Sequence, residues 1–220
     1  GIVAEGNPGR LYLSPTPEHI QAAKVDAGDA GIIGEIATNP RWFSPPAYGM
    51  REFSDLFTNR QLVALTTLSD LVPEVRNKVL EDALAAGIPA SERLEDGGVG
   101  AEAYADAVAT YLALGVSRTA DYCNALCTWH TTGDKVTHLF TRQAIPMTWD
   151  YTETNVLSNS SGNFLGQLKW VVKVIQRLPA EINGEAKQIS ATSRDYADLV
   201  VSTDPPYYDN IGYSDLSDFF

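Results

Sequence analysis

Apolar residues recur at helical spacing in the second quarter of the chain. Steps of three and four residues place side chains on one face of a helix. Thr58 followed by Gln61 forms a capping-box pattern, which begins a helix. The spacing predicts a helix after Thr58, with Gly87 as its C-terminal cap and Pro73 as a kink or the start of a second helix. The apolar stripe consists of Leu62, Leu65, Leu68, Leu71, Val72, Val75, Val79 and Leu84.

Two further segments have helical patterns. Residues 101–130 have helical character over most of their length, and Gly115 within them marks a break or a close packing contact. Residues 160–179 form an amphipathic pattern that Pro179 ends. The apolar positions of this last segment are Phe164, Leu165, Leu168, Val171, Val172 and Ile175.

Toward the C-terminus the sequence predicts short strands instead of long helices. AKQISAT (186–192) predicts a short strand, and SRDY after it predicts a turn. ADLVVST (197–203) predicts a second strand, almost entirely apolar apart from Asp198, as is typical of a strand buried on both faces of a parallel sheet. The chain therefore divides into an irregular Gly/Pro-rich segment (1–50), a helical region (51–134) and a partial α/β core (135–220).

Composition argues against three classes of protein, namely strongly basic nucleic-acid binders, disulfide-rich secreted proteins and membrane-spanning proteins. With a net charge of −12, the 220 residues carry no electrostatic footprint for nucleic acid, so any basic surface would lie elsewhere in a larger protein. The acidity is equally typical of a cytosolic protein kept soluble. Two cysteines are too few for a disulfide scaffold, and there is no signal peptide or membrane-length apolar run, so we expect a cytoplasmic location. The start at Gly1 and the end within YSDLSDFF indicate a piece of a larger protein.

The chemistry concentrates in TDPPYYDN (203–210), directly after the second predicted strand. Transfer of a group to an exocyclic amine is assisted when two acceptors converge on its N–H groups. Asp204 offers a carboxylate and Pro205 a carbonyl, while Pro205 and Pro206 stiffen the loop. Tyr207 offers a flat face for an extruded base, and Tyr208 and Tyr213 are further aromatic candidates for binding the substrate.

The same residues resemble the motif of a known family of enzymes. TDPPY after an apolar strand resembles the catalytic motif of amino methyltransferases that use S-adenosylmethionine. The longer STDPPYYDNIGYSDLSDFF is similar to the adenine-specific DNA methylases that carry a zinc ribbon, a family also described by a conserved N-terminal domain of unknown function. FTNRQLVALTTLSDL, LALGVSRTADYCNALCTW and RQAIPMTWDYTETN look like the same family, so the resemblance covers about residues 51–220.

The resemblance implies a fold, a reaction and a set of roles. The fold would be the doubly wound, Rossmann-like methyltransferase sheet with a helical insertion. The reaction would move a methyl group from S-adenosylmethionine to N6 of adenine in DNA without a metal. Asp204 and Pro205 would hold the amine and Tyr207 would stack on the base. The partners would be DNA, bound through the parent protein, and the remaining methyltransferase domains.

The chain departs from the family at the cofactor site. The glycine-rich stretches GDAGIIGE (28–35) and DGGVGAEAY (96–104) lack a preceding strand and are interpreted as loops. The zinc ribbon is missing too, because the sequence has no pair of CxxC units. The main S-adenosylmethionine motif is therefore expected upstream of Gly1, and this chain alone is expected to be inactive.

Other chemistry-bearing residues have plainer interpretations. Cys123 and Cys127, four apart on a predicted helix, are interpreted as buried thiols rather than zinc ligands with His130 and His138. Trp129, Trp149 and Trp170 are interpreted as core or interface residues, and Arg142 as weak evidence for a phosphate contact. Asp150 and Glu153 are interpreted as part of a solvated loop. Two alternatives to DNA methylation stay open, namely methylation of RNA or of a protein amide, and a non-catalytic helical interaction module.

Overall fold

The computed structural model describes residues 1–179, 184, 186–205, 207–208 and 210–220. Within this part the α-helices are α1 (Pro17–Ala22), α2 (Asn59–Ala85), α3 (Ala101–Ala120), α4 (Phe164–Ile175) and α5 (Tyr213–Ser217). The short 3-10 helices are η1 (Pro45–Tyr48), η2 (Phe53–Leu56), η3 (Leu94–Asp96) and η4 (Ala191–Ser193). The strands are β1 (Ile2–Glu5), β2 (Arg10–Leu13), β3 (Trp129–His130) and β4 (Lys135–Val136), in two antiparallel pairs.

The long helix α2 begins where the capping box places it. The Thr58 side chain accepts from the Gln61 backbone N–H at 3.3 Å, and the Gln61 Oε1 accepts from the Thr58 N–H at 2.9 Å. Gly87, just beyond the C-cap, has φ +87°, which confirms the predicted left-handed cap. The helix continues through Pro73 as one element, so the expectation of a second helix there is wrong.

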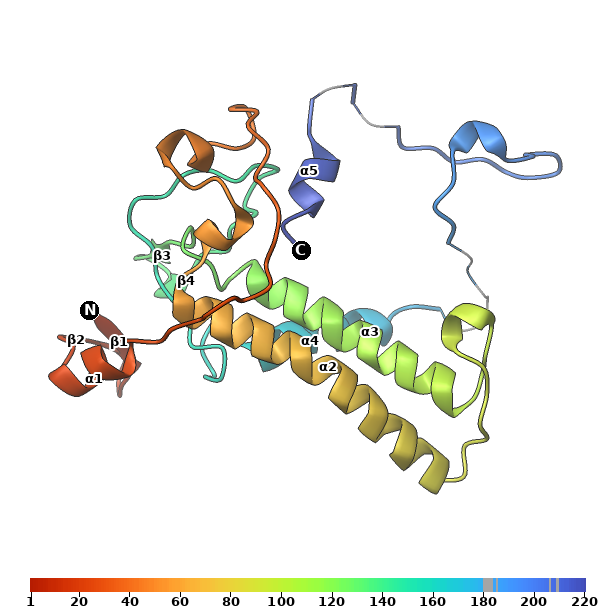
Figure 1. Ribbon diagram of the computed structural model, residues 1–220, viewed down its shortest axis with the longest axis horizontal. Coiled ribbons are helices and arrows are strands. Elements are labelled where there is room, and N and C mark those ends of the chain that lie inside the picture. The colour runs from red at the N-terminus through yellow and green to blue at the C-terminus, as the bar shows by residue number, and fades with distance from the viewer. Residues whose placement is uncertain (180–183, 185, 206, 209) are drawn as a thin grey trace.

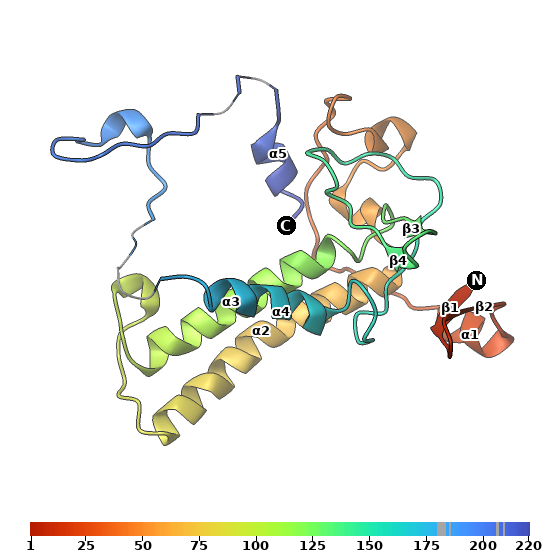
Figure 2. The same ribbon diagram turned by 180° about the vertical axis from the view of Figure 1, so that it is seen from behind.

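Helices α2 and α3 form a hairpin, and α4 packs on the far side of α3 (Figures 1 and 2). Gly115 of α3 is buried, and a Cβ added there would lie 2.4 Å from Leu168 Cδ2 of α4. This confirms the close-contact interpretation of the glycine. The predicted amphipathic helix is confirmed over 164–175, and it ends four residues before Pro179.

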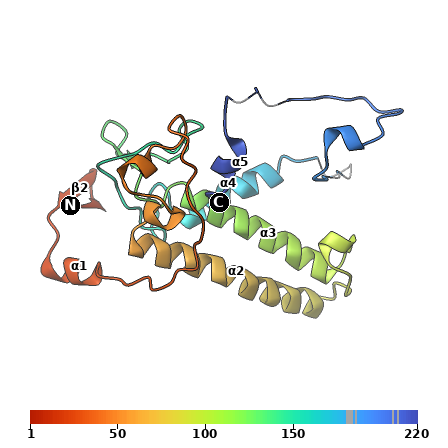
Figure 3. The same cartoon turned by 45° about the horizontal axis from the view of Figure 1, so that its top comes forward.

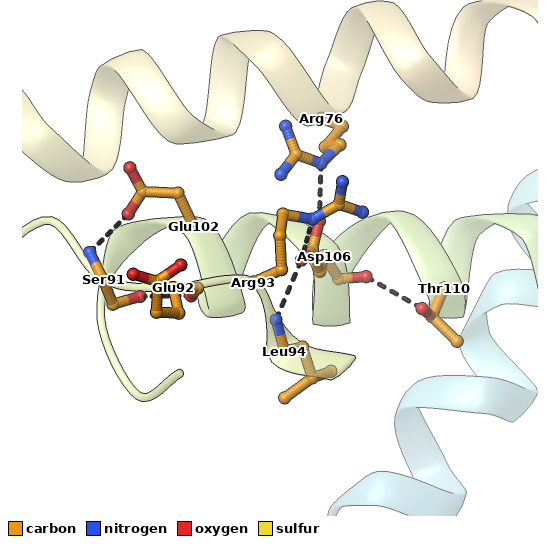
Figure 4. Close-up of polar contacts among 8 residues, drawn as sticks. All are labelled: Arg76, Ser91, Glu92, Arg93, Leu94, Glu102, Asp106 and Thr110. Carbon is orange, nitrogen blue, oxygen red and sulfur yellow. Dashed lines mark hydrogen bonds and ion pairs between the residues drawn. The ribbon is translucent and has the colours of Figure 1, made fainter. Parts of the chain in front are cut away.

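A buried carboxylate ties the helical hairpin together (Figure 4). Asp106 of α3 accepts from Arg76 Nε of α2 and from Arg93 Nε of the connecting loop, both at 2.6 Å, and from the Leu94 N–H at 3.0 Å. The two guanidinium groups, Arg93 first, and the backbone N–H stabilise the charged form and hold the pKa of Asp106 well below its ordinary value of 3.8. One side chain thus fixes α2, α3 and the loop between them.

The main hydrophobic core lies at one end of the helical hairpin. It joins segments that are far apart in sequence, because residues 36–43, η2, the loops after α3 and the C-terminal α5 all contribute. Phe43 and Ile145 form a parallel β-bridge within it. The buried members are Ile36, Trp42, Phe43, Phe53, Leu56, Leu126, Leu139, Ile145, Leu216 and Phe219.

The two predicted C-terminal strands are absent. Residues 186–205, all described, form only η4 and irregular chain, and they loop away from the helices before α5 returns (Figure 3). Leu199, Val200 and Val201 are exposed rather than buried. The physical reason is that a strand needs neighbouring strands for its backbone hydrogen bonds, and the described residues offer none here. The doubly wound methyltransferase sheet therefore stays a prediction.

Candidate functional site

Four of the residues singled out from the sequence surround one hollow. Asp204, Pro205, Tyr207 and Tyr213 line a concave space of about 220 Å³. This is below the roughly 300–1,000 Å³ of pockets for drug-sized ligands, and it suits a single flat ring. Tyr207 is 68% exposed and Tyr213 is 52% exposed, so both rings are available to a ligand.

Two of the sequence candidates do not line this hollow. Tyr208 has φ +54° and is 97% exposed, and it is not among the lining residues. Its predicted role in binding the substrate is therefore unsupported by its position. Pro206 was expected to stiffen the loop, and it lies outside the described residues.

The Asp204 carboxylate has no bonding partner among the described residues. The side chain is exposed, and within the described part of the chain it has neither a hydrogen-bond donor nor an ion-pair partner. A carboxylate turned inward and bonded to its own backbone would have pointed part of its acceptor capacity away from a substrate amine. Its acceptor capacity instead stays open at the edge of the hollow.

The loop that carries the hollow is fastened to the first fifty residues. The Asn210 N–H donates to the Tyr207 carbonyl at 3.1 Å, which closes a turn after the tyrosine pair. Trp42 Nε1 donates to the Asn210 carbonyl at 3.0 Å, and Arg41 Nη2 donates to Asn210 Oδ1 at 3.2 Å. Asn210 is therefore held through its backbone and through its side chain.

Helix α5 completes this attachment. Gly212 lies against the Trp42 indole, since a Cβ there would come within 3.1 Å of Trp42 Cε3. Leu216 and Phe219 are buried in the main core. Tyr213, at the start of the same helix, is thus presented to the hollow from a rigid support, whereas the chain before Asp204 lies free of the core.

Sequence reasoning missed Arg41 and Trp42. They lie in the Gly/Pro-rich segment 1–50, which was interpreted as irregular and given no functional residue. The signal for the turn was present, because Asn39 accepts from the Arg41 N–H through its side chain and from the Trp42 N–H through its carbonyl. The partner of that turn, 168 residues away in the chain, had no local signal.

Neither glycine-rich stretch forms a cofactor cradle. In 28–35, the N–H groups of Gly28 and Gly31 already donate to Asp26 and Asp29, at 2.9 Å each. In 96–104, a Cβ on Gly98 would lie 1.9 Å from the Glu92 carbonyl oxygen, so this glycine permits close approach of backbone to backbone. These two stretches therefore do not fit an S-adenosylmethionine site. Residues 28–34 and 97–100 are loop, as interpreted, whereas 101–104 begin α3.

Cys123 and Cys127 are buried free thiols, as the sequence predicted. They do not share a helix face, because α3 ends at Ala120 and both lie in the turns that follow. His138 Nδ1 lies 3.0 Å from Asp121 Oδ2, and His130 Nδ1 accepts from the Gly133 N–H. In the described part of the chain, no group of three or more His, Cys, Asp or Glu side chains is placed to hold a metal ion.

These thiols should not react in the folded protein. Cys123 is 1% exposed and Cys127 is 0% exposed, and burial raises their pKa values to about 11 and about 12. At pH 8 only on the order of one Cys123 in a thousand would be a thiolate, which is the reactive form. A disulfide-exchange colour assay is expected to detect no fast thiol in native protein and two after unfolding. Labelling within minutes under native conditions would contradict this arrangement.

The remaining candidates have ordinary surroundings. Trp129 packs edge-on against Tyr12, while Trp149 and Trp170 are largely exposed, so the latter two are not core residues within this chain. Arg142 and Asp150 are exposed. Glu153 is not simply solvated, because it forms a two-pronged ion pair with Arg60 at 2.5 and 2.8 Å.

A larger hollow of about 1180 Å³ lies between the N-terminal hairpin, α1 and residues 151–161. Its charged walls are mutually paired, since Arg10 bonds Glu5 and Arg60 bonds Glu153. Among the residues that line it, both carboxylates, Glu5 and Glu153, are therefore already paired, whereas the Asp204 carboxylate at the smaller hollow has no partner among the described residues.

Comparison of the chain with protein-family models, with curated proteins and with solved structures found no match. None of the helices in the described residues combines the length and the apolarity that crossing a bilayer requires.

Proposed function

We propose that this chain carries the part of a methyltransferase site that holds the target amine, in an enzyme that methylates N6 of adenine in DNA with S-adenosylmethionine. The observation that carries the proposal is the hollow lined by Asp204, Pro205, Tyr207 and Tyr213, with the Asp204 carboxylate uncommitted at its edge. The proposal places the enzyme in the cytoplasm. It also places the cofactor site outside residues 1–220, since the glycine-rich loops present do not fit one.

The chain's own residues supply two contributions. The Asp204 carboxylate and the Pro205 carbonyl each accept one N–H of the amine, which weakens delocalisation of the nitrogen lone pair into the ring. Accepting both N–H groups favours the tetrahedral nitrogen that forms as the amine attacks, and this is electrostatic stabilisation of the reacting group. Tyr207 and Tyr213 offer flat faces that compensate an extruded base for the stacking it loses in the duplex, at about 1–3 kcal/mol per stacked base.

The direct test is methyl transfer by the full-length protein that contains this chain. The protein is incubated with methyl-labelled S-adenosylmethionine and, separately, double-stranded DNA, RNA of the same sequence, and a mixture of proteins. Label is expected in DNA, and digestion to nucleosides should identify N6-methyladenine. Label confined to RNA or protein would replace the substrate class, and no label in any arm would overturn the methyltransferase assignment in favour of a non-catalytic module.

A further inference from the structure

Arg41 is hydrogen-bonded to the segment that carries the hollow lined by Asp204, Pro205, Tyr207 and Tyr213, and it is not itself a lining residue. It bonds Asn210, whose N–H in turn bonds the Tyr207 carbonyl, so two hydrogen bonds link Arg41 to a residue of the hollow. Asn210 also lies three residues before Tyr213, which lines the same hollow. Arg41 belongs to residues 1–50, for which the sequence predicted no function.

The backbone of Arg41 is held firmly although its side chain is exposed. Its N–H donates to Asn39 Oδ1 at 3.0 Å. The next residue, Trp42, is buried, and its carbonyl accepts from the Ile145 N–H at 2.7 Å within the core. The guanidinium lies over the Trp42 ring at 5.8 Å from the centroid, which restricts its orientation. A cation held in this way is partly ordered before any ligand binds.

Among the described residues, no carboxylate forms an ion pair with Arg41. Arg10, Arg60, Arg76 and Arg93 each form an ion pair with a carboxylate, whereas Arg41 has only the neutral Asn210 oxygen among the described residues. A guanidinium has five N–H donors in a planar fork, so most of its donors stay open. That fork matches the geometry of a phosphate.

A base placed in the hollow brings phosphates with it. Each nucleotide in a strand has a phosphodiester on both sides of its sugar, and the residues that line the hollow include no cation. The same hollow belongs to a chain of net charge −12, which repels a nucleic-acid backbone. A partly ordered cation bonded to the segment that carries the hollow, with no carboxylate partner among the described residues, would offset that repulsion close to the bound base.

From this geometry we infer that Arg41 binds a phosphate adjacent to the target nucleotide and is a substrate-binding residue of the enzyme. The inference rests on the proposed function. It extends the site to a residue outside the Asp204–Tyr213 segment, and it assigns a role to part of residues 1–50.

The test uses the full-length protein and two duplexes with one target adenine. One duplex is unmodified, and in the other the two phosphates that flank the target adenine are uncharged methylphosphonates. Wild-type enzyme should have a KM about tenfold higher for the modified duplex, as expected for the loss of a charge-assisted hydrogen bond. Arg41→Ala should show that higher KM on both duplexes, with kcat within about twofold of wild type. Arg41→Lys should recover part of the difference, because the charge is kept and the fork is lost.

One control variant and two alternative outcomes complete the test. Arg177→Ala, which removes an exposed cation beyond the end of α4, should discriminate between the duplexes as wild type does. If Arg41→Ala only loosened the loop, it would still discriminate between the duplexes, and the inference would be overturned while the proposed function stood. If wild-type enzyme methylated neither duplex, the proposed function would fail and the phosphate role with it.

Discussion

Replacing Asp204 with alanine should abolish most methyl transfer by the full-length enzyme while leaving the fold intact. The side chain is exposed and, within the described residues, has no partner, so its removal breaks no structural contact. The substrate amine would keep only the Pro205 carbonyl as acceptor. Removal of one electrostatic contact from an oxyanion hole lowers kcat by about 10²–10³-fold, and we expect a loss of that order here. Label transfer from S-adenosylmethionine to DNA measures the effect directly.

Asp204→Asn sharpens the same prediction. Asparagine keeps the shape but replaces one acceptor oxygen by a donor, which would face the N–H groups of the substrate. We expect a loss in kcat close to that of alanine, with KM for DNA nearly unchanged, because Tyr207 and Tyr213 still receive the base. Asp218→Asn is the matched control, since Asp218 is exposed in the same C-terminal segment and does not line the hollow. Equal label incorporation by wild type and the Asp204 variants would contradict the proposed methyltransferase function.

The features that the sequence predicted correctly are local ones. The Thr58–Gln61 capping box and the Gly87 cap depend on residues within one or two helical turns. Gly115 predicts a close packing contact, although the sequence does not show which residue makes it. Each involves a backbone requirement that a few neighbouring residues satisfy. Such requirements can be recognised in a single sequence.

The features that the sequence did not predict depend on distant partners. The apolar run Leu199–Val201 has the composition of a buried strand, but the described residues contain no neighbouring strand to pair with it. The attachment of Asn210 to Arg41 and Trp42 joins residues 168 and more positions apart. Composition indicates what a segment can do in a sheet or a site, whereas its partners are set by the tertiary structure.

Asp106 offers the largest expected effect on stability. Asp106→Asn would leave the Arg76 and Arg93 guanidinium groups without their shared carboxylate at the junction of α2, α3 and their loop. Arg93 is half exposed and can turn to water, but Arg76 is mostly covered and would keep an unpaired charge. We expect the melting temperature to fall by on the order of 10 °C at pH 7, in the range for breaking a buried ion pair in a chain of this size.

The pH dependence tests whether the charge of Asp106 is the cause. Its pKa is lowered in the folded state, so the unfolded chain takes up the proton first as the pH falls. The stabilisation is therefore complete at neutral pH and declines below about pH 4, and the deficit of Asp106→Asn relative to wild type should be smaller at pH 3 than at pH 7. Asp82→Asn is the control, because its ion pair with Lys78 on α2 is exposed and should change the melting temperature by less than about 2 °C. A deficit that stays constant between the two pH values would mean that Asp106 acts through packing rather than through its charge.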